Sequence, residues 1–449
     1  MRSSHFLISA PSSNSGKTTL TLGLLRALKN KGLHVQPFKC GPDYIDTQHH
    51  TTASGNPGIN LDTFMASEDH VREIYKQYSE EAHVSVTEGV MGLFDGADKM
   101  RGSSAAIAEL LDIPVILVIN AKSMAYSAAP LLYGFKNFYR GIRVVGAIFN
   151  FVSTISHYRF LQEACEEVGI EPLGYLPKNE ALAIPSRHLG LHISAETDYE
   201  SIIEQLAQEI PKTINIERLL EISTREISPE IEPETLSQTP VPTKKYKISV
   251  ARDEAFTFTY YQNIEVLSSF GEITFFSPIH DKELPEVDFL YLPGGYPELF
   301  ADALNENKTM LESIKSYCLN GGLTFAECGG LMYLANEMIT SEGFNFSMVG
   351  MLDCATSMEN SKLTLGYRTI RWNDLELKGH EFHYSRLLEN RLETEPVTVK
   401  NAKGIEVETR LYRKLNTFAS YVHLYWGENF GFIEYLLKHF TSKGFTQSR

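Results

Sequence analysis

The stretch HFLISAPSSNSGKTTLTLGLLRALKNKG, residues 5–32, decides the fold of the first half of the chain. It indicates an apolar strand, a loop of small polar residues and a helix. In a P-loop, backbone N–H groups surround the phosphates, a lysine neutralises their charge and the next hydroxyl binds Mg²⁺. We therefore predict a nucleotide-binding loop formed by Ser13, Asn14, Ser15, Gly16, Lys17, Thr18 and Thr19.

Pro11 occupies the first glycine position of the usual P-loop pattern. A plain strand-to-helix turn is therefore the alternative interpretation. The strand before the loop and the helix after it favour the phosphate-binding one, because a chance Gly-Lys-Thr would rarely have both flanks.

Further apolar runs alternate with helix-length segments, at residues 34–39, 83–89, 114–120, 144–150 and 171–177. This rhythm predicts a mostly parallel sheet covered by helices. A segment rich in Pro, Glu, Ser and Thr follows, and the α/β pattern then restarts. Since 449 residues exceed the size of a single core, we predict two three-layer α/β domains. They are a P-loop ATP-binding domain at 1–209, which the resemblance described below implies to be a synthetase, and a second domain at 246–441, joined by a linker at 210–245.

Composition excludes several classes of function. The net charge of −15 argues against nucleic-acid binding, which needs a basic surface. No run of eighteen apolar residues predicts a membrane span, and the first residues lack a signal-peptide pattern, so we expect a cytoplasmic protein without membrane association. Cys40, Cys165, Cys318, Cys328 and Cys354 show no paired spacing, which disfavours disulfides and zinc sites.

Two stretches beside the P-loop carry carboxylates. VSVTEGVMGLFDG, residues 84–96, places Glu88 at the end of a strand, where it could reach Mg²⁺; Asp95 is a weaker candidate that could simply shape the DG turn. KCGPDYID, residues 39–46, follows another strand at the same sheet edge, where ligands of open α/β folds bind. Lys39, Asp43 and Asp46 are therefore candidates for phosphate, metal or substrate contacts, with a structural turn as the alternative. The adjacent His49 and His50 are compatible with a surface or a metal-binding role.

FAECGGLMYL, residues 325–334, indicates a nucleophile elbow in the second domain. A short strand runs into Cys328, and two glycines then open a helix whose dipole favours a thiolate. The amide of Gly329 could stabilise an oxyanion, together with Gly294 or Gly295 of LPGGYPEL. His423 is the candidate base, with His380 and His383 as rivals.

The combination of PGGYPEL, AECGGLMYL and a late histidine resembles triad-type (class I) glutamine amidotransferase domains of the cobyric acid branch. The acid that most of the class carries two places after the histidine is replaced here by Tyr425. The N-terminal half resembles dethiobiotin-synthetase-like ATPases. KCGPDYID, GINLDTFM and EGVMGLFDG together resemble the cobyrinic acid a,c-diamide synthases, and the resemblance covers nearly the whole chain.

The resemblance implies an activity. Cys328 would attack the side-chain amide of glutamine while His423 transfers protons, and the released ammonia would amidate the a- and c-side-chain carboxylates of cobyrinic acid through acyl phosphates made from ATP. Thr18, Asp43 and Glu88 would bind Mg²⁺, whereas Lys39, Asp43, Asp46 and Asp95 would face substrate and acyl phosphate. By the same analogy Asn150 would read the adenine edge.

Two alternatives remain at this stage. One is the same chemistry on hydrogenobyrinic acid or nickel-sirohydrochlorin. The other is a P-loop switch ATPase with a non-catalytic C-terminal interaction module. The expected partners are ATP, glutamine and a corrinoid tetrapyrrole, and a homodimer is left open.

Overall fold

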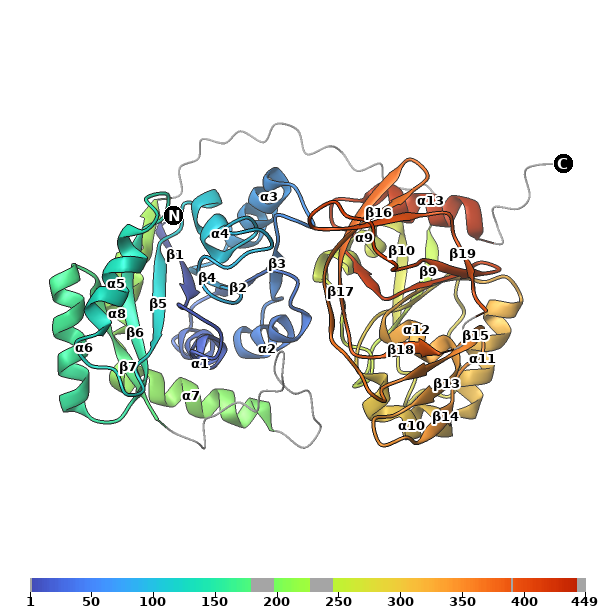
Figure 1. Cartoon of the computed structure of the whole chain (residues 1–449), viewed down its shortest axis with the longest axis horizontal. Helices are drawn as coiled ribbons and strands as arrows, with labels where there is room; N and C mark the ends of the chain where they lie inside the picture. The colour runs from blue at the N-terminus through green and yellow to red at the C-terminus, as the bar shows by residue number, and fades with distance from the viewer. Residues whose placement is uncertain (1, 179–197, 227–244, 389–390, 442–449) are drawn as a thin grey trace. The chain divides into compact units, whose positions relative to one another are not determined.

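Strand β1 (Arg2–Ser9) lies in the middle of the first sheet of the computed structural model, which describes residues 2–178, 198–226, 245–388 and 391–441. The chain forms two units (Figure 1). The first contains residues 1–63 and 67–234, and the second contains residues 64–66 and 235–449. The prediction of two α/β domains is confirmed.

The first sheet has the strand order β3-β2-β4-β1-β5-β6-β7, with all these strands parallel, and β8 pairs antiparallel with β1. Its strands are β2 (Val35–Cys40), β3 (Ile59–Leu61), β4 (Val84–Glu88), β5 (Val115–Asn120), β6 (Val144–Val152), β7 (Glu171–Pro177) and β8 (Thr224–Glu226). The apolar runs of the sequence become β1, β2, β4, β5, β6 and β7, because parallel strands are buried on both faces. The carboxyl ends of β1, β2 and β4 therefore meet at one edge.

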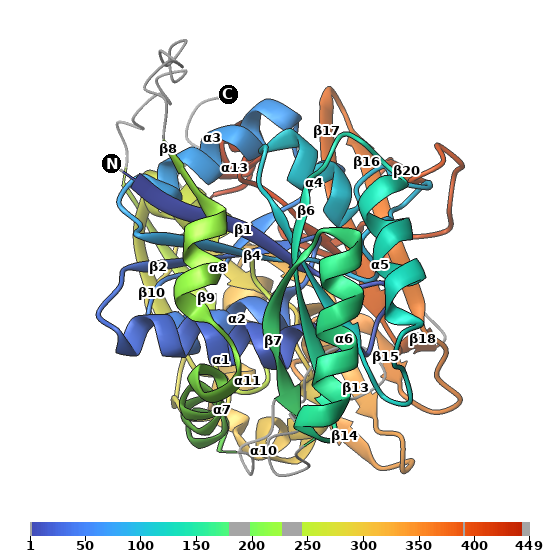
Figure 2. The ribbon, with the colours of Figure 1, turned by 90° about the vertical axis from the view of Figure 1, so that its left-hand side faces the viewer.

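Helices cover this sheet. They are α1 (Lys17–Asn30), α2 (Tyr44–Ser54), α3 (Glu68–Ser79), α4 (Ser104–Leu110), α5 (Ala128–Asn137), α6 (Ile155–Val168), α7 (Tyr199–Thr213) and α8 (Ile216–Ser223). Helix α1 packs against α2 and α7, and Figure 2 shows α5 beside α6. Within the described residues, no helix is both long and apolar enough to cross a bilayer.

The segment predicted as a linker starts later than expected. Residue 210 lies inside α7, α8 follows, and β8 pairs with β1. Apolar residues at helical spacing bury one face of these helices: Ile203, Leu206, Ile210, Ile216 and Leu219. The first unit therefore extends beyond the predicted boundary at residue 209: residues 210–226 belong to it, and residues 227–244 lie outside the described residues.

The second unit is built on a sheet of order β10-β9-β11-β12-β22-β21-β19, parallel from β10 to β22. Its strands are β9 (Tyr246–Ala251), β10 (Gly271–Phe276), β11 (Phe289–Leu292), β12 (Leu323–Glu327), β19 (Glu393–Thr394), β21 (Tyr412–Lys414) and β22 (Thr417–Ser420). Both faces are buried, since Leu290 and Leu292 of β11 face one core while Phe289 and Tyr291 face another.

The helices of this unit are α9 (Tyr261–Phe270), α10 (Ala301–Glu306), α11 (Lys308–Leu319), α12 (Gly329–Leu334) and α13 (Phe430–Phe440). Two further sheets have the orders β14-β13-β15-β18 and β20-β16-β17-β23. Their strands are β13 (Ala335–Ile339), β14 (Asn345–Ser347), β15 (Leu352–Ser357), β16 (Thr364–Trp372), β17 (Leu375–His383), β18 (Arg386–Leu388), β20 (Thr398–Asn401) and β23 (Val422–Leu424). All five cysteines of the chain are free and buried.

Candidate active sites

The loop between β1 and α1 has a backbone suited to an anion. Asn14 and Gly16 have φ angles of 61° and 86°, in the left-handed region. Such residues turn neighbouring N–H groups toward a common point, and the amino end of α1 adds its dipole. A Cβ on Gly16 would lie 1.9 Å from Nδ2 of Asn150, so only glycine fits there. The geometry is that of a phosphate-binding loop.

Asn150 braces this loop. Its Nδ2 donates to the carbonyl of Ser15 at 3.1 Å, and its Oδ1 accepts from the amide of Phe151 at 2.9 Å. Reading an adenine edge would require the amide to exchange these bonds for new ones. That role stays a prediction, and the bonds seen here are to the loop and to its own strand.

Lys17 is buried beneath the loop that follows β4. Its Nζ donates to the carbonyl of Met91 at 2.6 Å and to that of Ser12 at 3.4 Å. Burial, helped by the charge of Lys39, lowers the pKa of Lys17 to about 8. The lysine is therefore held next to the P-loop by backbone carbonyls rather than by a carboxylate.

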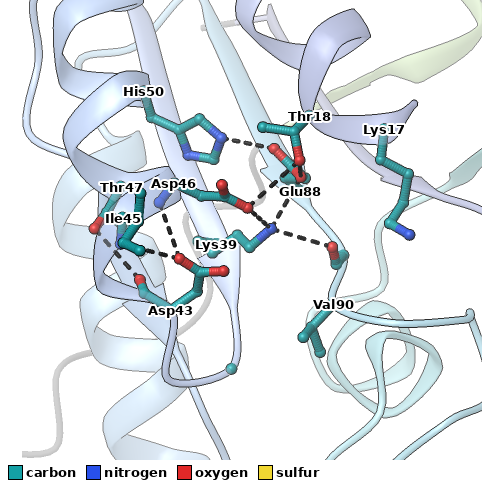
Figure 3. A network of polar contacts seen from close by, with 12 residues as sticks. Lys17, Thr18, Lys39, Asp43, Ile45, Asp46, Thr47, His50, Glu88 and Val90 are labelled. Atoms are coloured by element: carbon teal, nitrogen blue, oxygen red, sulfur yellow. Dashed lines mark hydrogen bonds and ion pairs between the residues drawn. The ribbon is translucent and has the colours of Figure 1, made fainter. Parts of the chain in front are cut away.

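Glu88 is the centre of a buried polar cluster (Figure 3). The parallel register of β2 and β4 places Lys39 opposite Glu88. Nζ of Lys39 lies 2.9 Å from Glu88 Oε1 and 2.5 Å from Asp46 Oδ2, and Thr18 Oγ1 donates to Glu88 Oε1 at 2.7 Å. Burial opposes the charged form of both Lys39 and Glu88. The neighbouring carboxylates nevertheless hold the pKa of Lys39 well above its ordinary value. Lys39 and His50 in turn lower the pKa of Glu88. The cluster is a compensated ion network.

The donor set beside the P-loop fits a magnesium ion. A P-loop hydroxyl and one strand-end carboxylate are the protein ligands that Mg²⁺ uses in nucleotide sites, because phosphates and water fill the remaining positions. Thr18 and Glu88 are already in contact with each other. Among the described residues, no group of three or more His, Cys, Asp or Glu side chains forms an all-protein metal site.

Asp43, a candidate for metal and substrate contacts, caps helix α2. Its Oδ1 accepts from the amides of Ile45 at 3.0 Å and Asp46 at 2.9 Å, so it is the N-cap of α2. Burial, together with the charge of Asp46, raises its pKa to about 6. Of the two aspartates, Asp46 is the one whose side chain contacts Lys39 and comes within 3.5 Å of Thr18 Oγ1. The contacts of Asp43 seen here are those of a helix cap, and its metal and substrate contacts remain predictions; Asp46 is the stronger candidate for ligand contacts.

His50, for which the sequence left a surface and a metal-binding role open, is buried beside Glu88. Its Nε2 lies 2.7 Å from Glu88 Oε2, and both side chains are completely buried. The available signal was its position one helical turn after Asp46, on the same face of α2. His49 instead packs on Tyr199, with ring centroids 4.5 Å apart.

Asp95 shapes the loop in which it lies. Its Oδ2 accepts from the amide of Gly92 at 3.1 Å, and its own amide donates to the carbonyl of Gly92. A Cβ on Gly92 would lie 2.7 Å from the carbonyl oxygen of Pro11, so this turn packs directly on the P-loop. The observed contacts are those of a turn residue, and a substrate contact of Asp95 remains a prediction.

Cys328 has the strained backbone of a nucleophile elbow. It lies between β12 and α12 with φ 46° and ψ −101°, a conformation that non-glycine residues rarely adopt. Its Sγ donates to the carbonyl of Phe382 at 3.7 Å. Burial, reinforced by the charge of Glu298, raises the pKa of the thiol. In this state the cysteine is a thiol, so attack on an amide requires a base.

The PGG loop touches both the elbow and His423. A Cβ on Gly329 would lie 3.0 Å from the amide nitrogen of Gly295, and one on Gly294 would lie 2.1 Å from Cε1 of His423. The strand register adds a second link, since the amide of Cys328 donates to the carbonyl of Ser420 at 2.7 Å, three residues before His423. The predicted nucleophile, base and oxyanion glycines therefore lie in one small region.

His383, one of the two rival histidines, has other partners. Both ring nitrogens of His383 are engaged, by Ser385 O at 2.8 Å and by Glu381 Oε1 at 3.1 Å. His380 lies opposite His423 in the antiparallel pair of β17 and β23. Burial, with repulsion from His380, lowers the pKa of His423 to about 3, so its imidazole is neutral and able to accept a proton. The geometry favours His423 as the base.

Acidification is expected to destabilise the second unit. Burial lowers the pKa of His380 to about 4 and that of His423 to about 3, whereas both titrate near 6.5 when unfolded. Below pH 6.5 the unfolded chain gains protons that the folded one does not, so stability is lost as the pH falls. At pH 5 each histidine costs about 2 kcal/mol. Calorimetric melting between pH 7.5 and 5 measures the loss of stability. If the stability of a His380→Gln variant depended on pH as steeply as that of the unchanged protein, the prediction would be contradicted.

Comparison with known proteins adds independent information. The model of a CobQ/CobB/MinD/ParA nucleotide binding domain matches residues 6–191, and that of a CobB/CobQ-like glutamine amidotransferase domain matches residues 247–430. A solved glutamine amidotransferase aligns with 42% of this chain and 97% of its own, at 16% identity and a TM-score of 0.30. The two family matches coincide with the two units of the structure.

Curated relatives match along the whole chain. The cobyrinate a,c-diamide synthase of Listeria monocytogenes is 39% identical, covering 96% of this chain and 98% of that protein. The enzyme of the same name from Priestia megaterium is 38% identical, covering 97% and 96%. That from Caldanaerobacter subterraneus is 40% identical, covering 93% and 94%.

Proposed function

The chain belongs to the cobyrinate a,c-diamide synthase family, and on that premise we propose that it amidates the a- and c-side-chain carboxylates of cobyrinic acid in cobalamin biosynthesis. It is a glutamine-dependent amide ligase with an ATP-binding domain. The observation that carries the proposal is the arrangement of the strained Cys328, the PGG loop and a neutral His423 in one unit, in a chain whose other unit holds a P-loop.

In the proposed glutaminase reaction, His423 accepts the proton of the Cys328 thiol as sulfur attacks the amide carbon of glutamine. The amides of Gly295 and Gly329 stabilise the oxyanion, since the PGG loop packs on the elbow. The same imidazole then protonates the leaving ammonia. Water hydrolyses the remaining thioester to glutamate and regenerates the thiol.

In the proposed ligase reaction, a substrate carboxylate oxygen attacks the γ-phosphorus of ATP, and ADP leaves. Ammonia then displaces phosphate from the acyl phosphate to form the amide. The P-loop amides and Lys17 hold the phosphates and offset their charge. Mg²⁺ would be held by Thr18 and Glu88 and would supply further charge neutralisation.

Product mass tests the substrate. The enzyme is incubated with ATP, Mg²⁺, glutamine and one tetrapyrrole, either cobyrinic acid, hydrogenobyrinic acid or nickel-sirohydrochlorin. We expect cobyrinic acid to gain two amides, each coupled to the hydrolysis of one ATP. Amidation of only one of the other two compounds would redirect the substrate assignment. Absence of any glutaminase or amidation would favour a P-loop switch ATPase instead.

A further inference from the structure

A buried carboxyl group joins the strand that ends at Cys328 to the strand that carries His423. Glu327 directly precedes Cys328, and its side chain is 1% exposed. Its Oε1 accepts from the amide of Leu424, the residue after His423, at 3.0 Å, and its Oε2 accepts from the hydroxyl of Tyr291 at 2.8 Å. One side chain therefore bonds across the interval between the candidate nucleophile and the candidate base.

We propose that Glu327 is a positioning residue for glutamine hydrolysis, which fixes the backbone of β23 and so holds His423 in register with Cys328. The inference rests on the proposed function of these two residues. Tyr425, two residues after His423, has no carboxyl group. Here the carboxyl group comes from the nucleophile strand and acts on the backbone beside the histidine.

A second buried side chain completes the brace. Asn263 of α9 is fully buried; its Nδ2 donates to the carbonyl of Leu424 at 2.8 Å, and its Oδ1 accepts from the amide of Trp426 at 2.7 Å. Asn263 ties this backbone to a helix, whereas Glu327 ties it to the strand that ends at the cysteine. Of these two side chains, Glu327 is therefore the one that links the backbone beside His423 to the strand that ends at Cys328.

Glu381, the other buried carboxylate of this region, has different partners. Its Oε2 accepts from Arg368 Nε at 2.6 Å and from Thr409 Oγ1 at 2.8 Å. Its Oε1 lies 3.1 Å from His383 Nε2. Both oxygens are thus committed to groups other than the β23 backbone, which leaves Glu327 as the better positioned carboxyl.

The charge state of Glu327 suits this role. Burial raises its pKa to about 8, although the bonds from Leu424 and Tyr291 favour the ionised form. Among the titratable groups, Tyr291 of β11 contacts it, Cys328 at the elbow follows it in the chain, and His423 of β23 adjoins Leu424, which bonds to it; β22 pairs with it through Ser420, which does not titrate. A negative charge on Glu327 raises the pKa of Cys328, so a protonated Glu327 braces the site without opposing thiolate formation.

Three measurements on the full chain test the proposal: glutaminase kcat/KM, amidation with added ammonia, and Tm. Glu327→Leu should lower glutaminase kcat/KM about 10²-fold through misplacement of the base, while ammonia-dependent amidation stays within about twofold. Glu327→Gln, which keeps an oxygen for the Leu424 amide, should restore most of the loss. The glutaminase kcat/KM of Glu327→Gln should not change above pH 8, whereas that of the unchanged enzyme should fall there because Glu327 ionises.

The controls separate the possible causes. Leu436→Ala, a change on the buried face of α13, should lower Tm without lowering glutaminase kcat. The proposal would be overturned if Glu327→Leu kept wild-type glutaminase activity, or if it lost glutaminase and ammonia-dependent amidation equally. If Glu327→Leu does not fold, the proposal would be overturned by a pH profile of glutaminase kcat/KM that is the same in Glu327→Gln and in the unchanged enzyme. If Cys328→Ala kept glutaminase activity, the proposed function itself would be refuted. If Cys328→Ala lost glutaminase activity while Glu327→Leu kept all of it, only the role of Glu327 would be refuted.

Discussion

Cys328→Ala is expected to abolish glutamine hydrolysis and to leave amidation with added ammonia. Alanine removes the sulfur that forms the thioester, so glutaminase kcat should fall by about 10³-fold or more. The change is small in volume and leaves the ATP-binding unit untouched. The measurement is glutamate release from glutamine, compared with ATP-dependent product formation at saturating ammonium.

Cys354→Ala is the matched control. It also removes a buried thiol from the second unit, in strand β15, and should retain glutaminase. If both variants lost activity equally, the effect would be one of folding. If Cys328→Ala still released glutamate at the wild-type rate, the nucleophile would be another residue. If Cys328→Ala were also inactive with added ammonia, the separation of the two reactions would be contradicted.

The fold was predictable because its signals are local. Apolar runs separated by helix-length segments identify buried parallel strands, and every run used for that prediction became a strand. The boundary after residue 209 was not predictable in this way. Helix α8 carries apolar residues at helical spacing, but strand β8 is the short polar segment Thr-Arg-Glu, which joins the first unit by pairing with β1, more than two hundred residues earlier in the sequence.

The candidate sites were predictable where a motif fixes the backbone, as at the P-loop and the elbow. They were less predictable where a side chain has a choice of partners. Asp43 and Asp46 are equivalent in sequence, yet only the first caps α2. Glu327 stood inside a quoted motif, but its role depends on Tyr291 and Leu424, which come beside it through strand pairing and tertiary packing. His50 likewise becomes relevant only through Glu88.

Lys17→Ala is expected to abolish amidation with glutamine and with ammonia alike, while glutaminase activity persists. The variant lacks the cation that offsets phosphate charge during transfer, and we expect a loss of at least about 10²-fold. Alanine is the best helix former, so the first turn of α1 should remain intact. Phosphate release and product mass report the ligase reaction, and glutamate release reports the other.

Lys17 is a better candidate for this charge than Lys39. The charge of Lys39 is already compensated by Asp46 and Glu88, whereas Lys17 Nζ donates to backbone carbonyls, which carry no net charge. A phosphate group that binds here can therefore form an ion pair with Lys17 without breaking an existing one. Lys29→Ala, an exposed change on the same helix, should keep full activity. Wild-type amidation in Lys17→Ala would show that Lys39 or a bound cation alone suffices, and would place the phosphate contact on the Glu88 side of the loop.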